Sequence, residues 1–79
     1  MSLHLQPVQI ATGSDDTESR LVFADGFLVA VLVRLSDEHE DEAGRWFLEA
    51  AFGRVADPNP PTFADMSEAQ EWIEQQLSS

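Results

Sequence analysis

The chain has 79 residues, of which 4 are basic and 15 acidic, and its formal net charge is -11 at pH 7. A surface this acidic repels phosphate groups, whereas affinity for nucleic acids comes mainly from Lys and Arg. The same repulsion acts at anionic membrane surfaces. The charge therefore argues against DNA, RNA or membrane binding, and the length predicts one domain spanning residues 1–79.

The composition is that of a folded protein, since 43% of the residues are hydrophobic and disordered chains combine high charge with low apolar content. Cysteine is absent, which excludes disulfides and thiolate catalysis. No basic residue precedes Arg20, so a secretory signal is not expected. The apolar run 27–33 is far shorter than the roughly 20 residues that span a bilayer, and we expect a cytoplasmic protein.

The N-terminal segment is predicted to be an edge strand. Residues 3–6 and 8–10 alternate apolar with polar side chains, which is typical of a half-buried strand. Pro7 interrupts this pattern, and because it lacks a backbone N–H it favours an edge or a bulge. Residues 12–19 are rich in turn formers and acidic side chains, which predicts a loop.

Residues 20–35 predict a β-hairpin. Asp25-Gly26 lies between two apolar runs, and a type I′ turn requires positive φ at both of its central residues. A two-residue turn aligns the strands in one register. The expected pairs are Ala24 with Phe27, Phe23 with Leu28, Val22 with Val29, and Leu21 with Ala30.

The second half of the chain predicts one more strand and a helix. The acidic segment 36–44 is expected to be a solvated connection, residues 45–52 a strand, and residues 57–61 a proline-rich crossing loop. Asp65 and Glu68 form a capping box, although Ser67 and Gln70 offer the same pattern two residues later. The helix that follows has one apolar stripe, made of Met66, Ala69, Trp72, Ile73 and Leu77.

The predicted fold class is α+β: a small antiparallel β-meander of three to four strands packed against one C-terminal α-helix. In the strand 45–52, Trp46, Leu48, Ala50 and Phe52 are expected to share one face. Trp46 and Trp72 are interpreted as core residues, since they lie on apolar stripes that would face each other.

Both faces of the predicted hairpin are apolar, although a single helix can cover only one of them. One face is expected to carry Val22, Ala24, Phe27, Val29, Val31, Val33 and Leu35. The other face is the hypothetical interface, and its residues are Leu21, Phe23, Leu28, Ala30, Leu32 and Phe47. Exposed apolar patches on small proteins usually mark interfaces. We expect a homodimer first, cover by the chain's own N-terminal segment or loops, above all residues 55–64, second, and a foreign partner third.

No motif in the sequence predicts catalysis, a cofactor or a metal site. His39 is surrounded by carboxylates, but a zinc-binding HExxH motif needs a second His where the chain has Ala43. The calcium-loop pattern is also missing there. The sequence contains neither a G-x-S-x-G elbow nor a phosphate-binding loop. A nonenzymatic protein without cofactors is therefore expected.

The segments 21–35, 44–53 and 63–73 resemble a group of small bacterial proteins of unknown function, which implies no activity and no functional residues. The order of elements and the Glu68-Ala69 step at the helix start are similar to HicB-type antitoxins. That resemblance implies binding to a small basic toxin, and the DNA-binding tail of many such antitoxins has no counterpart after Leu77.

Two functions follow from these observations as hypotheses. The leading one is a noncatalytic protein-interaction module that self-associates. The other is an antitoxin-like or nucleic-acid-mimicking neutraliser of a basic protein partner, in which the carboxylates of residues 15–18 and 37–42 fill a cationic groove.

Overall fold

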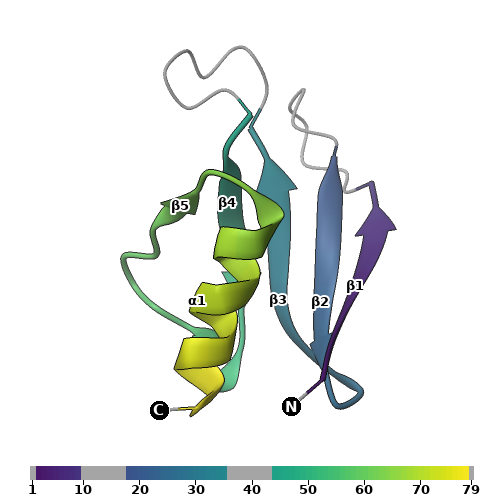
Figure 1. The fold of residues 1–79 in the computed structure, drawn as a ribbon, viewed down its shortest axis with the longest axis vertical. Helices are drawn as coiled ribbons and strands as arrows, with labels where there is room; N and C mark the ends of the chain where they lie inside the picture. The colour runs from purple at the N-terminus through teal and green to yellow at the C-terminus, as the bar shows by residue number, and fades with distance from the viewer. Residues whose placement is uncertain (1, 10–17, 36–43, 79) are drawn as a thin grey trace.

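The computed structural model describes residues 2–9, 18–35 and 44–78. They form a five-stranded antiparallel sheet of order β1-β2-β3-β4-β5, so each strand pairs with its neighbour in the chain (Figure 1). This confirms the predicted α+β meander with a C-terminal helix. The elements are β1 (Leu3–Val8), β2 (Ser19–Ala24), β3 (Phe27–Arg34), β4 (Trp46–Ala51), a 3₁₀ turn (Gly53–Val55), β5 (Thr62–Phe63) and α1 (Met66–Ser78).

Strand β1 forms one edge of the sheet, as its proline predicts. Pro7 lies inside the strand, opposite Arg20 of β2. An edge position tolerates proline because one side of the strand needs no ladder hydrogen bonds. The opposite edge is β5, a two-residue strand that the sequence pattern did not predict.

The β2–β3 hairpin turns at Asp25-Gly26, as expected. Asp25 has φ 51° and Gly26 has φ 91°, so both central residues take the positive φ that a type I′ turn requires. The first two pairs beyond the turn, Ala24 with Phe27 and Phe23 with Leu28, are also those predicted.

Beyond these two pairs a β-bulge changes the register. Val22 pairs with Ala30 instead of Val29, and Leu21 pairs with Val31 instead of Ala30. A shift of one residue moves the following side chains to the opposite face of the sheet. The predicted pairs of Val22 with Val29 and Leu21 with Ala30 are therefore wrong.

A second bulge lies between β3 and β4. Leu32 pairs with Leu48 and Val31 with Ala50, which leaves Glu49 as the additional residue of β4. Leu48 consequently remains on the face of Leu32, whereas Ala50 lies on the face of Val31. The prediction that Ala50 shares the face of Leu48 is wrong for the same reason.

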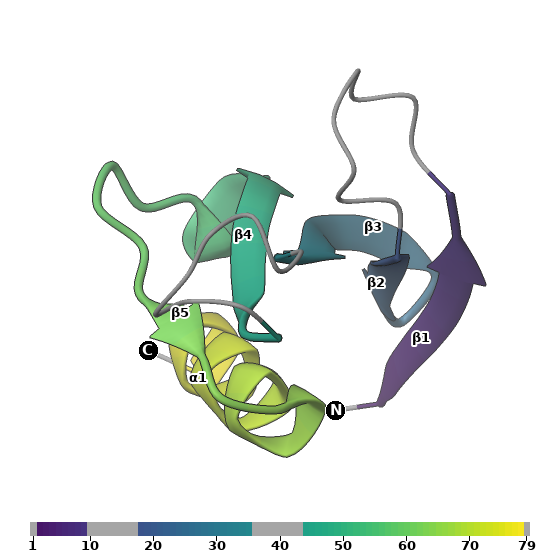
Figure 2. The ribbon, with the colours of Figure 1, turned by 90° about the horizontal axis from the view of Figure 1, so that it is seen from above.

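Helix α1 lies on one face of the sheet, on the side of β3, β4 and β5 (Figures 1 and 2), and Val22 and Ala24 of β2 are also buried on this side. Ala69 and Ile73 of the helix are fully buried, and Met66, Trp72 and Leu77 pack around them, which confirms the predicted stripe. The buried core on this side contains Val22, Ala24, Val29, Ala30, Leu32, Trp46, Leu48, Val55, Phe63, Ala69 and Ile73.

The first turn of α1 is capped by Asp65, which confirms the first of the two predicted helix starts. The backbone N–H of Glu68 donates to Asp65 Oδ1 at 2.9 Å. The Glu68 side chain reaches back, and its Oε2 accepts from the Ala64 N–H at 3.2 Å. These two bonds satisfy backbone donors that have no partner within the helix.

The segment between β4 and α1 packs into the helix-side core. Val55 of the 3₁₀ turn and Phe63 of β5 are almost fully buried there, and the Phe63 and Trp72 ring centroids lie 5.6 Å apart. No helix in the described part of the chain is long and apolar enough to span a membrane.

Candidate interaction surface

The face of the sheet opposite α1 carries an apolar surface. Side chains of directly paired residues project from the same face, and the pairs Leu21–Val31, Val31–Ala50 and Val33–Phe47 connect three strands in this way. Phe23 and Leu28 form a further pair on this side. We call this surface the helix-free face, and it consists of Leu21, Phe23, Leu28, Val31, Val33, Phe47 and Ala50.

The helix-free face is buried at its centre and exposed at its flanks. Val31 and Val33 are only 9% and 2% exposed, yet neither belongs to the helix-side core. Leu21 and Phe23 are half-buried, whereas Leu28 and Phe47 are each 37% exposed. Apolar surface therefore remains accessible at Leu28 near the hairpin turn and at Phe47 of β4, and the buried Val31 and Val33 lie between them along β3.

Polar side chains border the helix-free face. His4 and Gln6 of β1 lie opposite Phe23 and Leu21, and Thr62 of β5 lies opposite Phe47. The His4 and Phe23 ring centroids are 6.2 Å apart. An apolar centre with a polar rim is the usual composition of a protein–protein interface.

The acidic charge of the described residues lies mostly away from this face. The five strands contain one acidic residue, Glu49 in the β4 bulge. Helix α1 exposes Glu68, Glu71 and Glu74, and it lies on the other side of the sheet (Figure 2). Among the described residues, the exposed acids of α1 therefore lie on the side of the sheet opposite the helix-free face.

Four of the six predicted interface residues lie on the helix-free face: Leu21, Phe23, Leu28 and Phe47. The other two, Ala30 and Leu32, are fully buried in the helix-side core, and their placement on this face was wrong. The cause is the bulge at Val29, which reverses the alternation of all later β3 residues. Val31 and Val33 take their places, and no local sequence signal marks the bulge.

Two phenylalanines predicted for the covered face are exposed instead. Phe27 is 74% exposed beside the Asp25-Gly26 turn, and Phe52 is 49% exposed just after β4. The Phe52 N–H donates to the carbonyl of Val29 at 3.0 Å. Both residues lie at strand ends, and the pairing of β3 with β4 stops at Ala30 and Ala51, before it reaches either of them.

Two segments considered as intrachain cover lie elsewhere in the described part of the structure. Val55 and Phe63, which belong to the segment 55–64, are part of the helix-side core. The N-terminal residues 3–8 form the edge strand β1 within the sheet itself. Neither segment packs across the exposed side chains of Leu28 and Phe47.

The main polar cluster of the described residues lies at one end of the sheet. Glu18 accepts from Arg20 at 3.3 Å and from Arg34 at 3.2 Å, and the Arg20 guanidinium lies 5.3 Å from the Trp46 ring centroid. Arg20 also donates to the Ser19 carbonyl at 2.9 Å. These charged groups already satisfy one another, as expected of a structural ion-pair cluster.

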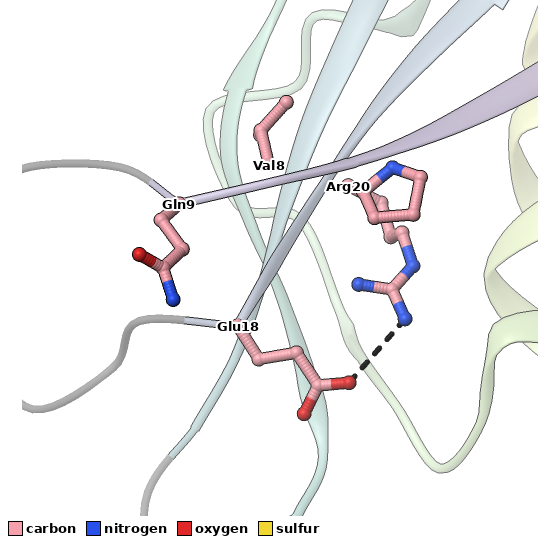
Figure 3. Close-up of a pocket in the computed structure, with 5 residues that line it drawn as sticks. Val8, Gln9, Glu18 and Arg20 are labelled. Atoms are coloured by element: carbon pink, nitrogen blue, oxygen red, sulfur yellow. Dashed lines mark hydrogen bonds and ion pairs between the residues drawn. The ribbon is translucent and has the colours of Figure 1, made fainter.

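A pocket of about 520 Å³ adjoins this cluster (Figure 3). Its lining combines apolar side chains with the Arg20–Glu18 ion pair, and the lining residues are Pro7, Val8, Gln9, Glu18 and Arg20. The described lining residues therefore offer a neutralised charge pair and include no Ser, Thr, Cys or Lys that could act as a nucleophile.

Metal binding has no candidate site within residues 2–9, 18–35 and 44–78, where no three His, Cys, Asp or Glu side chains gather closely enough to hold an ion. His39 and the acidic segments 10–17 and 36–43 lie outside the described residues. The prediction that residues 37–42 form a solvated loop without a specific metal site stays a prediction.

The fold and this surface define a small α+β protein with one sheet face covered by α1 and an opposite apolar face that α1 does not cover. No family model matches the chain, and no curated protein or solved structure matches it either. The resemblances to small bacterial proteins and to HicB-type antitoxins stay predictions, and the argument for function rests on the surface itself.

Proposed function

We propose that the chain is a noncatalytic protein-interaction module that works, and self-associates, through its helix-free face. The observation that carries this proposal is the accessible apolar surface around Leu28 and Phe47, each 37% exposed on the side of the sheet that α1 does not cover. Exposed apolar surface on a small protein is a feature of interaction sites.

The free energy gained by burying exposed apolar side chains favours a role in binding. Fully burying one large apolar side chain stabilises by about 1.5 to 3 kcal/mol, and a domain of this length has a stability of only about 4 to 12 kcal/mol. Because Leu28 and Phe47 are each only 37% exposed, covering them contributes a fraction of this free energy for each side chain. A partner that covers them recovers it.

A second candidate function is neutralisation of a basic partner, and one feature of the sheet supports it. The ends of β1 and β3 and the starts of β2 and β4 lie at the same edge of the molecule (Figure 1). The connections leaving there carry seven carboxylates: Asp15, Asp16, Asp37, Glu38, Glu40, Asp41 and Glu42. Such a concentration of charge attracts a cationic surface and speeds its association.

Site-specific photocrosslinking tests the proposed face. Phe47 is replaced by the photoreactive residue p-benzoylphenylalanine, and the matched control carries it at Gln75, an exposed position of α1. Both variants are irradiated in a lysate of the source organism, and adduct masses are read by gel and mass spectrometry. We expect discrete adducts from position 47 and none of the same mass from position 75.

Equal adducts from the two positions, or none from position 47, would overturn the proposal. An adduct that forms at position 47 at low ionic strength and disappears at high salt favours the neutraliser. Charge attraction is screened by salt, whereas apolar contact is not.

A further inference from the structure

We infer that the free edge of β1 binds an extended basic segment of another protein, which pairs with β1 as an additional strand of the sheet. Strand addition of this kind takes its affinity from main-chain hydrogen bonds. The edge is a different surface from the helix-free face, so the inference goes beyond the proposed function. It supplies an attachment site for the second candidate function, the binding of a basic partner.

Strand β1 is the long edge of the described sheet. It has six residues, whereas β5 at the opposite edge has two, and no described element lies beyond β1 (Figures 1 and 2). Proteins commonly protect such an edge with charged side chains, proline, a bulge or a covering segment. Strand β1 contains Pro7 but no Lys, Arg, Asp or Glu. The residues that precede Pro7 therefore form an open edge.

The direction of the β1 backbone groups follows from the hydrogen bond beside the hairpin turn. The Asp25 N–H donates to the Ser2 carbonyl at 3.3 Å, so this carbonyl points toward β2. Residues that bond to the neighbouring strand alternate with residues that do not along an antiparallel ladder. His4 and Gln6 are accordingly bonded to β2, and the residues between them direct their backbone groups away from the sheet.

A second hydrogen bond gives the same alternation from the other side of β2. The Arg34 N–H donates to the Glu18 carbonyl at 2.8 Å, so the backbone of Glu18 points toward β3. By the same alternation Leu21 points toward β1. Leu21 is the partner of Gln6, which again makes Gln6 a residue bonded to β2.

The groups that point out of the sheet are the N–H groups of Leu3 and Leu5 and the carbonyls of Leu3, Leu5 and Pro7. Pro7 has no N–H, and at this position the missing donor would have pointed away from β2. The sheet thus loses no hydrogen bond at Pro7. An added strand finds no donor there, so Pro7 limits strand addition to the residues that precede it.

The charge of the chain selects a basic segment as the occupant. The net charge is -11, and Arg20, the cation opposite Pro7, already binds Glu18 at 3.3 Å. A protein with this charge attracts cationic segments and repels acidic ones, including a second copy of itself. Main-chain pairing alone does not depend on the side chains of the added strand, so the charge provides the preference.

Amide hydrogen exchange measured by NMR tests the inference on the full chain. The probe is a peptide of about eight residues, a usual strand length, in which Lys and Val alternate. The control peptide alternates Lys and Pro, which keeps the charge and removes every second N–H. The amides of Leu3 and Leu5 are expected to exchange at least about tenfold more slowly with saturating Lys-Val peptide than without it. The Gln6 amide, which is bonded to β2, is the internal reference.

A pair of variants tests the outward N–H of Leu5. Leu5→Pro removes this N–H and is expected to weaken binding of the Lys-Val peptide at least about fivefold, the effect of one main-chain hydrogen bond. Leu5→Ala shortens the same side chain, retains the N–H and is expected to keep the affinity of the wild type. Circular dichroism confirms that both variants fold.

The inference is overturned if the Lys-Val peptide does not slow exchange at Leu3 and Leu5, or if the Lys-Pro peptide or an alternating Glu-Val peptide slows it equally. Slow exchange that appears on raising the protein concentration without peptide assigns the edge to a second copy and also overturns it. A Lys-Val peptide that shifts only the NMR signals of Leu28 and Phe47 overturns the edge site and leaves the proposed function intact. That function fails separately, if position 47 crosslinks to no protein at all.

Discussion

Both faces of the sheet are apolar, and along β3 they differ in burial near the hairpin turn, because Val31 and Val33 of the helix-free face are only 9% and 2% exposed. Strand β3 contributes Ala30 and Leu32 to the face under α1, where both are fully buried, and Leu28 to the opposite side, where it is 37% exposed. Seven of its eight residues are apolar. Hydrophobicity along the strand therefore does not decide which face becomes core. The helix and the bulge at Val29 decide it together.

The largest effect is expected from one substitution made on each face of β3. Leu32→Glu places an unpaired charge in the helix-side core, which costs several kcal/mol and is expected to unfold the domain. Leu28→Glu adds the same charge on the helix-free face, where the side chain reaches water, and the protein is expected to fold. Circular dichroism and urea titration of both variants measure the difference, and two equally unfolded variants would contradict the comparison.

The next largest effect concerns the cover on the helix side. Trp72 is half-buried and packs on Phe63, so Trp72→Ala is expected to cost about 3 kcal/mol, the lower end of the range for large aromatics. In a domain of this size that loss lowers the melting temperature by at least about 12 °C. Gln75→Ala on the exposed side of α1 is the control, with an expected change within about 0.5 kcal/mol. If the melting temperature of Trp72→Ala hardly changes, α1 does not pack into the core through Trp72.

A smaller effect is expected at the start of the helix that separates the two faces. Asp65→Ala removes the acceptor of the Glu68 N–H bond and is expected to cost about 1 kcal/mol. Ser67→Ala is the matched control, because Ser67 would be the cap if the helix began two residues later. Chemical denaturation measures the free energy of unfolding of both variants. A larger loss of stability in Ser67→Ala than in Asp65→Ala would contradict the observed cap.

The smallest effect is expected at the ion-pair cluster. Glu18 and Arg34 are about half exposed, so Glu18→Gln is expected to cost less than about 1 kcal/mol, and less still at high salt. Glu71→Gln relieves repulsion from Glu68 and Glu74, one helical turn away on either side, and is expected to stabilise slightly. Thermal melts at two salt concentrations distinguish the loss of stability expected for Glu18→Gln from the small gain expected for Glu71→Gln. A loss above about 2 kcal/mol in Glu18→Gln would make the cluster a major support of the fold.

The parts of the fold that the sequence predicted correctly are those with local causes. The Asp25-Gly26 turn, the Asp65 cap and the apolar stripe of α1 each depend on residues within a few positions of one another. Their chemistry acts in the same way wherever the segment lies in the fold. Four of the six interface residues followed from the turn and the strand alternation.

The parts that the sequence did not predict depend on contacts between distant segments. The bulges at Val29 and Glu49 accommodate the pairing of three strands, and nothing in the apolar run 27–33 marks the additional residue. Strand β5 has two residues and exists because Phe63 and Thr62 pair with β4. Ala30 and Leu32 were misplaced for this reason, since a single unrecognised insertion reverses all later positions.

The Glu18 cluster has a consequence for how the chain avoids misfolding. A strand that is apolar on both sides can slide by one residue against its neighbour at little hydrophobic cost, which makes competing arrangements nearly equal in free energy. Glu18 removes that degeneracy at the far end of the hairpin. Its carbonyl accepts from the Arg34 N–H at 2.8 Å while its carboxylate binds the Arg34 side chain. A slipped hairpin loses both bonds at once, so an exposed ion pair of small energetic value selects one folded state among its close competitors.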